Sequence, residues 1–310
     1  MSTMVSILVP VYNAASYLEE CLKSLAGQTY ADLQIVMIND GSTDDSWAVM
    51  QRLSRQDSRI EIYSQRNSGV AATRNRLLDK VRGDFVLFVD SDDWIEPQTV
   101  ECLMTEQAKG NYDMVVYQFV NALANTDGLF TRELAVKLFL EHKHMNGSLC
   151  NKLIRSILFK GLYFDETVTY GEDAMMVWQV LQRVQQVRII NQHLYHVRVN
   201  ADSLSRRPFN KNKCSVYTVW DYICGGVDDA WPQYSDLAHA RGACELTLVL
   251  RDAVKSGYND RTYIKHLQEV IHRDEHLIRA TGISSFKMSA FAWLVSHHYN
   301  LARLLAPYIK

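Results

Sequence analysis

Three carboxylates, Asp90, Asp92 and Asp93, follow an apolar run in this chain almost without interruption. The run covers residues 85–89, and a buried strand there would place the carboxylates at the carboxyl edge of a sheet, where open α/β sheets bind ligands. Mg²⁺ and Mn²⁺ prefer carboxylate oxygens and often share their shell with substrate phosphates. The pattern therefore fits a nucleotide diphosphate held through a divalent cation. Taken alone, such a pattern more often marks an ordinary turn or helix cap.

Three other polar loops are expected at the same edge of this sheet. They cover residues 10–13 after the first predicted strand, 39–44 after the second, and 67–75 before a helix. Loops that follow successive parallel strands gather at one edge, so these segments would surround the acidic run. Arg74 in the third loop would then lie near the phosphates, which a guanidinium binds well. Each loop taken singly also fits turn and capping chemistry.

The four motifs taken together carry a resemblance to a known family. They read V-P-V-Y-N, N-D-G-S-T-D, N-S-G-V-A-A-T-R-N and D-S-D-D, in this order over residues 9 to 93. This set resembles the family-2 glycosyltransferases of the GT-A fold, such as those of bacterial capsule, O-antigen and lipooligosaccharide synthesis. The resemblance is close over the first 100 residues. It continues less tightly to about residue 205, through 150–153, 171–173 and 203–205, and the C-terminal helices lie outside it.

The resemblance implies a nucleotide diphosphate sugar as donor, with a UDP-sugar expected, and Mn²⁺ or Mg²⁺ as cofactor. Pro10, Tyr12 and Asp40 would lie against the base, and Asp92 would be the direct metal ligand bridging the diphosphate. The residues expected to bind the nucleotide sugar are Pro10, Tyr12, Asn13, Asp40, Gly69, Arg74, Asp90, Ser91 and Asp93. The residues expected at the metal are Asp92, Asp90 and His196.

Glu172 and Asp173 resemble the family's acidic motif that supplies the catalytic base. In an inverting transfer, one carboxylate takes the proton from the acceptor hydroxyl as this hydroxyl attacks the anomeric carbon, and the metal stabilises the departing diphosphate. We expect Asp173 to be this base, with Glu172 beside it. The alternative is a plain helix start, where the helix dipole favours acidic side chains.

Two histidines and two cations are open to either a functional or a structural role. His193 and His196 follow a predicted strand, and some GT-A enzymes add such a histidine to the metal shell. His196 is the better placed, although structural histidines are more frequent than metal ligands. Lys152 and Arg198 could contact phosphate or acceptor, and surface charge is the alternative for both.

Alternating apolar strands and amphipathic helices over residues 4 to 100 predict an α/β fold with a mainly parallel, Rossmann-like sheet flanked by helices. The strands expected are 5–9, 33–38, 60–63, 85–89, 114–119 and 187–190. A helix is expected near 133–141, and the rest of 121–162 allows no assignment. From about residue 211 the pattern is helical. Together with the family resemblance, this implies a GT-A nucleotide-sugar-binding and catalytic domain over 1–210, and a helical accessory region over 211–310 for acceptor, membrane-surface or oligomer contacts.

The last predicted helix, residues 285–306, carries a broad apolar stripe with Lys287, Arg303 and Lys310 nearby. The stripe consists of Phe291, Leu294, Val295, His298, Leu305 and Tyr308. Such a stripe suits a membrane surface. Core packing or a contact within a homo-oligomer is the more frequent use.

The bulk properties set limits on partners and location. With 310 residues, 47% hydrophobic residues and a net charge of −2, the chain is expected to be globular and to have no nucleic-acid partner. Its six scattered cysteines form no C-x-x-C pair, and the short apolar run at 4–11 does not resemble a secretory signal. We therefore expect a cytoplasmic protein that contacts the cytoplasmic face of the inner membrane peripherally.

The leading hypothesis is an inverting glycosyltransferase that extends a bacterial surface polysaccharide on a hydroxyl of a glycan or lipid-linked glycan. One alternative is a nucleotide-sugar-binding subunit without transfer activity, which would keep the donor loops and lack a working base. A nucleotidyltransferase is a third reading, but no Gly- and Lys-rich phosphate loop near the N-terminus supports it.

Overall fold

The computed structural model describes residues 3–120, 126–142, 145–199 and 209–305. These residues belong to two compact units. The first comprises Met1–Val136, Lys143–Glu166 and Glu172–Val199, and the second comprises Lys137–His142, Thr167–Gly171 and Asn200–Lys310. The motif at 203–205 lies outside the described residues, and the functional division at residue 210 stays a prediction.

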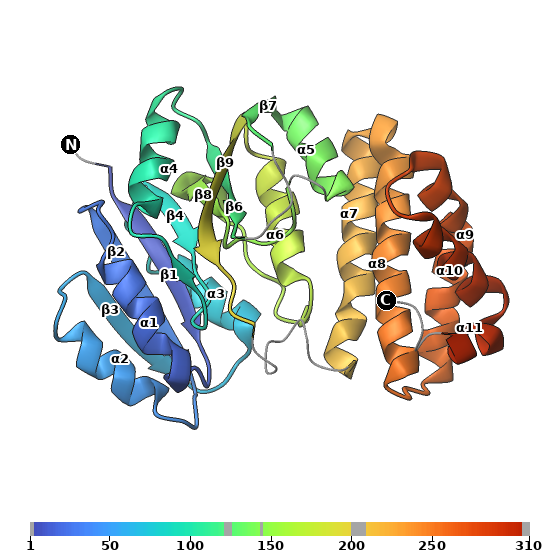
Figure 1. Ribbon diagram of the computed structural model, residues 1–310, viewed down its shortest axis with the longest axis horizontal. Helices are drawn as coiled ribbons and strands as arrows, with labels where there is room; N and C mark the ends of the chain where they lie inside the picture. The colour runs from blue at the N-terminus through green and yellow to red at the C-terminus, as the bar shows by residue number, and fades with distance from the viewer. Residues whose placement is uncertain (1–2, 121–125, 143–144, 200–208, 306–310) are drawn as a thin grey trace. The chain divides into compact units, whose positions relative to one another are not determined.

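One sheet forms the centre of the first unit, and nine strands of the described chain belong to it (Figure 1). Their order is β3 (Ile60–Gln65), β2 (Leu33–Asp40), β1 (Val5–Val11), β4 (Phe85–Phe88), β8 (Lys152–Arg155), β6 (Met114–Phe119), β9 (Gln186–His196) and β5 (Trp94–Ile95), with β7 (Gly128–Thr131) paired to β9. The first four strands in this order are parallel, and β8 runs antiparallel to both β4 and β6. The predicted α/β sheet is therefore confirmed, with antiparallel pairs added in the segment that the sequence left unassigned.

Helices cover both faces of the parallel strands. Strands β2 and β4 are buried along their whole length, as expected of strands packed on two sides. Helices α1 (Ala15–Ala26) and α2 (Ser46–Ser54) lie in front of these strands in Figure 1. The connection through α3 (Val70–Leu78) runs back across the sheet, so a right-handed crossover places α3 on the opposite face. The remaining elements of this part of the chain are α4 (Thr99–Ala108), α5 (Arg132–Glu141), η1 (Ser156–Phe159) and α6 (Glu172–Leu181).

Strand β9 is longer than the strand predicted at 187–190. It continues through the polar residues 191–193, which break the apolar pattern, because its backbone goes on pairing with β6 through an irregular register and then with β5. Trp94 of β5 is the register partner of His196. The extension places Tyr195 and His196 beside the acidic loop that follows β4.

The loops at the carboxyl edge of β1 and β2 hold each other in place. The Asn13 backbone N–H donates to Ser42 Oγ at 3.0 Å, and the Thr43 N–H donates to Asn13 Oδ1 at 2.8 Å. Gly41 has φ of 67°, and a Cβ there would lie 2.6 Å from the backbone nitrogen of Asn67. Only glycine allows this close approach of two loops.

The second unit is built from helices α7 (Val216–Ala230), α8 (Ser235–Lys255), α9 (Arg261–Thr281), α10 (Phe286–His297) and α11 (Tyr299–Leu305), with short turns η2 (Lys211–Ser215) and η3 (Pro232–Tyr234). Helix α8 packs between α7 and α9, and α10 packs on α8 and α9. The single helix predicted over 285–306 is two helices, because His298 leaves the helical region with φ of −132° and ψ of 58°. In the part of the chain that the structure describes, no helix combines the length and apolar content needed to cross a bilayer.

Candidate active site

A buried tyrosine, Tyr195, fixes the acidic loop after β4 through two hydrogen bonds. Tyr195 Oη accepts the Asp90 backbone N–H at 3.1 Å and donates to Asp93 Oδ2 at 2.9 Å. The Arg198 backbone N–H donates to the other Asp93 oxygen at 2.7 Å. Burial and the nearby Asp90 charge raise the pKa of Asp93 to about 7. Asp93 is only 5% exposed and anchors the loop, whereas the Asp90 side chain is 41% exposed.

Arg74 gathers three carboxylates around one buried guanidinium. Its Nη1 lies 2.6 Å from Glu172 Oε1 and 2.7 Å from Asp173 Oδ1, and its Nη2 lies 3.4 Å from Asp90 Oδ1. The Arg74 side chain is 5% exposed. These four residues, which we call the Arg74 cluster, come from α3, the loop after β4 and the first turn of α6. The structure therefore brings the predicted base and the acidic loop to one point.

The Arg74 cluster carries more negative than positive charge. Burial alone would lower the pKa of Arg74, but Asp173, Glu172 and Asp90 raise it, so the guanidinium stays charged. Burial raises the pKa of Asp173 to about 7, helped by Glu172 and Asp90 and opposed by Arg74. A carboxyl group with such a pKa exchanges a proton near neutral pH, as a general base must.

A loop between α5 and β8 supports Asp173 from the other side. The Leu149 backbone N–H donates to Asp173 Oδ2 at 3.4 Å. Lys152 is fully buried, and its Nζ donates to the carbonyl oxygens of Asn146 at 2.9 Å and Ser148 at 2.5 Å. Burial lowers the pKa of Lys152 to about 7. Lys152 thus fixes the loop, and the alternative that it lies at the surface is wrong.

Close packing also holds this loop against α6. A Cβ on Gly147 would lie 2.6 Å from the Ala174 Cβ, directly beside Asp173. A larger residue at 147 would therefore push the loop and the predicted base apart.

Asp40 organises the loop that precedes α3. Its carboxylate accepts the backbone N–H groups of Ser68 at 2.8 Å and Gly69 at 2.9 Å, together with the Gln65 amide at 2.8 Å. The residue is 4% exposed. Tyr12, at the neighbouring loop, is 50% exposed. The contacts of Pro10, Tyr12 and Asp40 with a nucleotide base stay predictions, as do the donor contacts of Asn13, Gly69 and Ser91.

His196 lies at the rim of the acidic loop and is engaged there. Its Nε2 is 2.6 Å from Glu96 Oε1, and its ring stacks on Trp94 with centroids 4.8 Å apart. Metal ligation through Nε2 would require breaking the Glu96 contact. His193 Nδ1 instead lies 2.9 Å from the Phe119 carbonyl oxygen.

Arg198 reaches the same loop. Its Nε donates to the Asp92 carbonyl oxygen at 2.9 Å, and its guanidinium lies 4.8 Å from the Trp94 ring centroid.

The protein ligands for a cation are few. Among the described residues, no three His, Cys, Asp or Glu side chains are close enough to hold a metal ion by themselves. Asp90 and Asp92 supply carboxylate oxygens at the edge of the sheet, where a phosphate-bearing ligand would complete the shell. Mg²⁺-type ions are bound in this way, by one or two carboxylates with substrate phosphates and water. The oxygen donors present therefore fit a divalent cation that binds together with a diphosphate.

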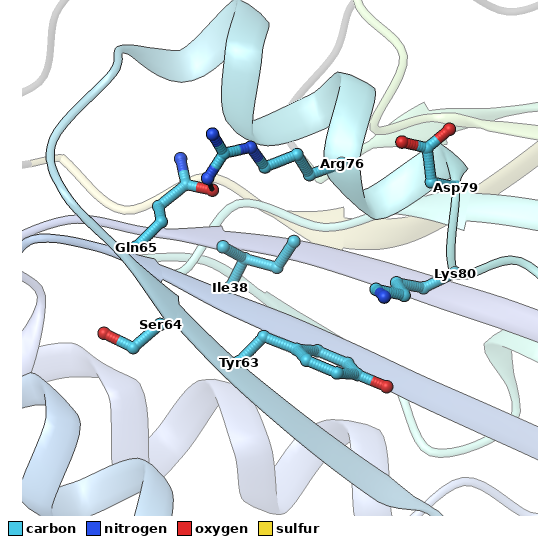
Figure 2. Close-up of a pocket in the computed structure, with 7 residues that line it drawn as sticks. All are labelled: Ile38, Tyr63, Ser64, Gln65, Arg76, Asp79 and Lys80. Carbon is cyan, nitrogen blue, oxygen red and sulfur yellow. Dashed lines mark hydrogen bonds between the residues drawn. The ribbon is translucent and has the colours of Figure 1, made fainter.

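A small cavity of about 240 Å³ lies over the edge strand β3 and the end of α3 (Figure 2). It is lined by Ile38, Tyr63, Ser64, Gln65, Arg76, Asp79 and Lys80, and none of the predicted site residues lines it. Arg76 Nη1 donates to Gln65 Oε1 at 2.6 Å, and the same Gln65 amide reaches Asp40. The cavity thus borders Gln65, which holds Asp40 in place. No residue of the Arg74 cluster lines it.

The family model described as glycosyl transferase family 2 matches residues 6–166, which is more than half of the chain. The chain belongs to glycosyl transferase family 2. The matched residues contain the four loops of the carboxyl edge. The sequence-based recognition of this family and of its GT-A fold is therefore confirmed.

Curated relatives of this family-2 chain are bacterial proteins. It is 34% identical over 220 residues to the glycosyltransferase GlyA of Streptococcus pneumoniae. The matched region covers 65% of this chain and 31% of GlyA. It is 29% identical over 223 residues to the glycosyltransferase EpsJ of Bacillus subtilis, covering 67% of the chain and 65% of EpsJ. The chain thus spans less than two thirds of the length of either relative.

Solved structures share the fold of this family-2 chain at low sequence identity. The structure of residues 1–349 of TarS from S. aureus, in complex with UDP-GlcNAc, has a TM-score of 0.70 and 20% identity, covering 98% of this chain and 92% of TarS 1–349. The mannosyltransferase PcManGT of Pyrobaculum calidifontis, in complex with GDP-Man and Mn²⁺, has a TM-score of 0.60 and 14% identity, covering 100% of this chain and 85% of PcManGT.

Sequence reasoning missed Tyr195, which ties Asp90 to Asp93. The sequence signal was the adjacent pair Leu194-Tyr195, but the polar stretch 191–193 separates this pair from the apolar run 187–190 and concealed the continuation of the strand. It also missed the Leu149 N–H, because a backbone donor from a distant loop leaves no mark in a residue pattern.

Proposed function

We propose that this family-2 chain is a metal-dependent, inverting glycosyltransferase that moves a sugar from a UDP-sugar to a hydroxyl of a glycan or lipid-linked glycan. The observation that carries the proposal is the Arg74 cluster. In it, Arg74 contacts both Asp173, whose pKa is raised to about 7, and Asp90 in the acidic loop at the carboxyl edge of the sheet. The glycosyltransferase names of bacterial relatives support the transfer activity, and the UDP-GlcNAc complex of a structure with the same fold supports a UDP-sugar donor. A role in bacterial surface polysaccharide synthesis in the cytoplasm is part of this proposal.

Asp173 acts as the general base in this proposal. Arg74 Nη1 lies 2.7 Å from its Oδ1 and the Leu149 N–H donates to its Oδ2, so the carboxylate is held in one orientation. It takes the proton of the acceptor hydroxyl while the oxygen attacks the anomeric carbon from the face opposite the diphosphate. Glu172 keeps Arg74 partly neutralised, which leaves Asp173 basic enough to accept this proton.

The donor lies along the four loops in this proposal. Tyr12 and Pro10 contact the base, Asp40 shapes the loop beneath it, and Asp90 and Asp92 hold the cation. A bound divalent cation stabilises the negative charge that develops on the leaving diphosphate. Mn²⁺ in the PcManGT complex supports a divalent metal for this fold. The catalytic domain would cover residues 1–210, with the helical region 211–310 as accessory.

The proposal is tested by nucleoside diphosphate release from a panel of UDP-, GDP- and dTDP-sugars. We expect one UDP-sugar to be hydrolysed slowly by the wild type in Mn²⁺ and not in EDTA. Asp92→Ala should lower this rate by at least about 10³-fold, because the metal loses its direct ligand. Circular dichroism and the unfolding midpoint should stay close to those of the wild type.

Two outcomes would contradict this function. Full activity of Asp92→Ala would remove Asp92 from the metal. Donor binding by calorimetry without hydrolysis, and without transfer to any glycan or lipid-linked acceptor, would favour the non-catalytic binding subunit instead.

A further inference from the structure

Helix α10 carries apolar side chains on two opposite faces. One face is buried against α8 and α9 and contains Phe291, Ala292 and Val295. The other carries Phe286 and Trp293, seven residues apart and therefore on one side of the helix, with exposed fractions of 74% and 46%. A helix that is apolar all round is normally covered on every side. The Phe286 face of α10 is not covered within the described chain.

Helix α11 extends this exposed apolar surface. Leu301, Leu304 and Leu305 are spaced as neighbours on one helical face and are 49%, 71% and 41% exposed. The Trp293 ring lies 5.4 Å from His298, the residue that joins α10 to α11. We call Phe286, Trp293, Leu301, Leu304 and Leu305 the C-terminal apolar face.

The charge along this part of the sequence has a single sign. The sequence from 276 to 310 contains no Asp or Glu, and its formally charged side chains are Arg279, Lys287, Arg303 and Lys310. In the whole chain, acidic residues outnumber basic ones, 35 to 33. Lys287 and Arg303 lie in α10 and α11 themselves, and both are exposed. The C-terminal apolar face therefore lies on a segment that carries only basic charge, in a protein that is otherwise slightly acidic.

We propose that the C-terminal apolar face docks on an anionic phospholipid surface, with Phe286, Trp293 and Leu304 inserted at the interface. Phe, Leu and Trp on one side with Lys and Arg beside them is the composition of interfacial helices. The cations meet the negative headgroups, and the tryptophan ring suits the boundary between headgroups and acyl chains. A second copy of the chain is the poorer occupant, because a symmetric contact through this face would bring like charges together. The proposal does not depend on the donor or the acceptor.

Vesicle flotation of the full chain without any sugar donor tests this docking. We expect the protein to float with vesicles of phosphatidylcholine containing about one third phosphatidylglycerol, to bind phosphatidylcholine alone at least about tenfold more weakly, and to be released by high salt. The double variant Phe286→Ser, Leu304→Ser should lose about tenfold or more in binding to the anionic vesicles. Both positions are highly exposed, so its unfolding midpoint should stay near that of the wild type.

Two further variants make the test specific. Lys287→Glu with Arg303→Glu should weaken binding to a similar extent without removing any apolar side chain. Ile157→Ser, which alters a 58% exposed apolar residue of the first unit, should leave binding unchanged. Absence of binding to the anionic vesicles, or equal loss in Ile157→Ser, would overturn the proposal. So would a dimer in sedimentation velocity that the Phe286→Ser, Leu304→Ser variant dissociates, because the second copy would then be the occupant.

Discussion

The two units each contain a charged cluster, and the two clusters differ in charge balance. In the first unit, one guanidinium, Arg74, faces three carboxylates. In the second, His239 Nδ1 lies 3.1 Å from Asp274 and its Nε2 lies 3.1 Å from Asp228, while Arg273 pairs with Asp274 at 2.7 Å. The His239 cluster thus has two cations for two anions when the imidazole is protonated, whereas the Arg74 cluster keeps an excess of negative charge.

The pKa values follow this balance. The hydrogen bond with Asp274 raises the pKa of His239 to about 8, against the effect of burial, and the pKa of Asp274 is lowered by its cationic partners although burial opposes this. In the Arg74 cluster, burial and like charges raise the pKa of Asp173 to about 7 instead. The His239 cluster, whose charges balance, joins helices α7, α8 and α9. The Arg74 cluster has an excess of negative charge that a bound proton or cation would offset. This contrast distinguishes a structural cluster from the cluster that we propose to be catalytic.

The largest effect on stability that would sharpen the contrast is expected from Arg74→Gln. This change leaves three carboxylates without their buried counter-charge, so we expect the free energy of unfolding to fall by about 3 kcal/mol in urea denaturation. Donor hydrolysis should fall by about 10²-fold or more, because Asp173 loses its orientation.

Arg74→Lys is the matched control for this change. It keeps the charge but cannot span three carboxylates, so it should recover most of the stability and little of the rate. Equal rates in Arg74→Lys and wild type would show that the fork geometry of Arg74 is not needed.

The pH dependence of the transfer rate gives the next largest effect. Because only the ionised form of Asp173 accepts a proton, we expect log kcat to rise by about one unit per pH unit up to about pH 7 and then to level off. Arg74→Lys should move the inflection to higher pH, since the carboxylate loses part of its stabilisation. An inflection near pH 4 in the wild type would show an unperturbed carboxylate and contradict the assignment.

The smallest effect is expected at the His239 cluster, from His239→Gln. The folded-state pKa of about 8 lies above the ordinary 6.5, so the stabilisation is fully present below pH 6.5 and is lost as pH rises through 8. We expect His239→Gln to lower the free energy of unfolding by up to about 2 kcal/mol near pH 6 and to have no effect near pH 9. A loss of stability that is the same at both pH values would mean that packing, not charge, explains the effect.

Much of the first unit could be predicted from the sequence because its signals are local. Strands such as Val5–Val11 and Phe85–Phe88 are apolar runs that end in turn residues, and the loops that follow them must meet at one edge of a parallel sheet. The carboxylates Asp90 and Asp173 were found in this way and through the family resemblance.

The partners of these residues could not be predicted, because they come from distant parts of the chain. Arg74 meets Glu172 across 98 residues, and Tyr195 meets Asp93 across 102. His239 carries no motif at all, and its partners lie on two other helices. Which apolar side of α10 is buried depends in the same way on its contacts with α8 and α9. The stripe predicted from the sequence contains Phe291 and Val295, and the structure buries both, so core packing is their role and the membrane reading of these two residues is wrong.

The most direct test of the contrast is donor hydrolysis by Asp173→Asn beside Asp274→Asn, each measured with the UDP-sugar that the wild type uses in Mn²⁺. Asp173→Asn removes one carboxylate charge from the Arg74 cluster of the first unit, and Asp274→Asn removes one from the His239 cluster of the second. We predict that Asp173→Asn loses about 10³-fold in rate while its donor affinity stays within about threefold, and that Asp274→Asn keeps the wild-type rate within about twofold and loses stability instead. Wild-type hydrolysis by Asp173→Asn would show that the Arg74 cluster does not contain the catalytic base.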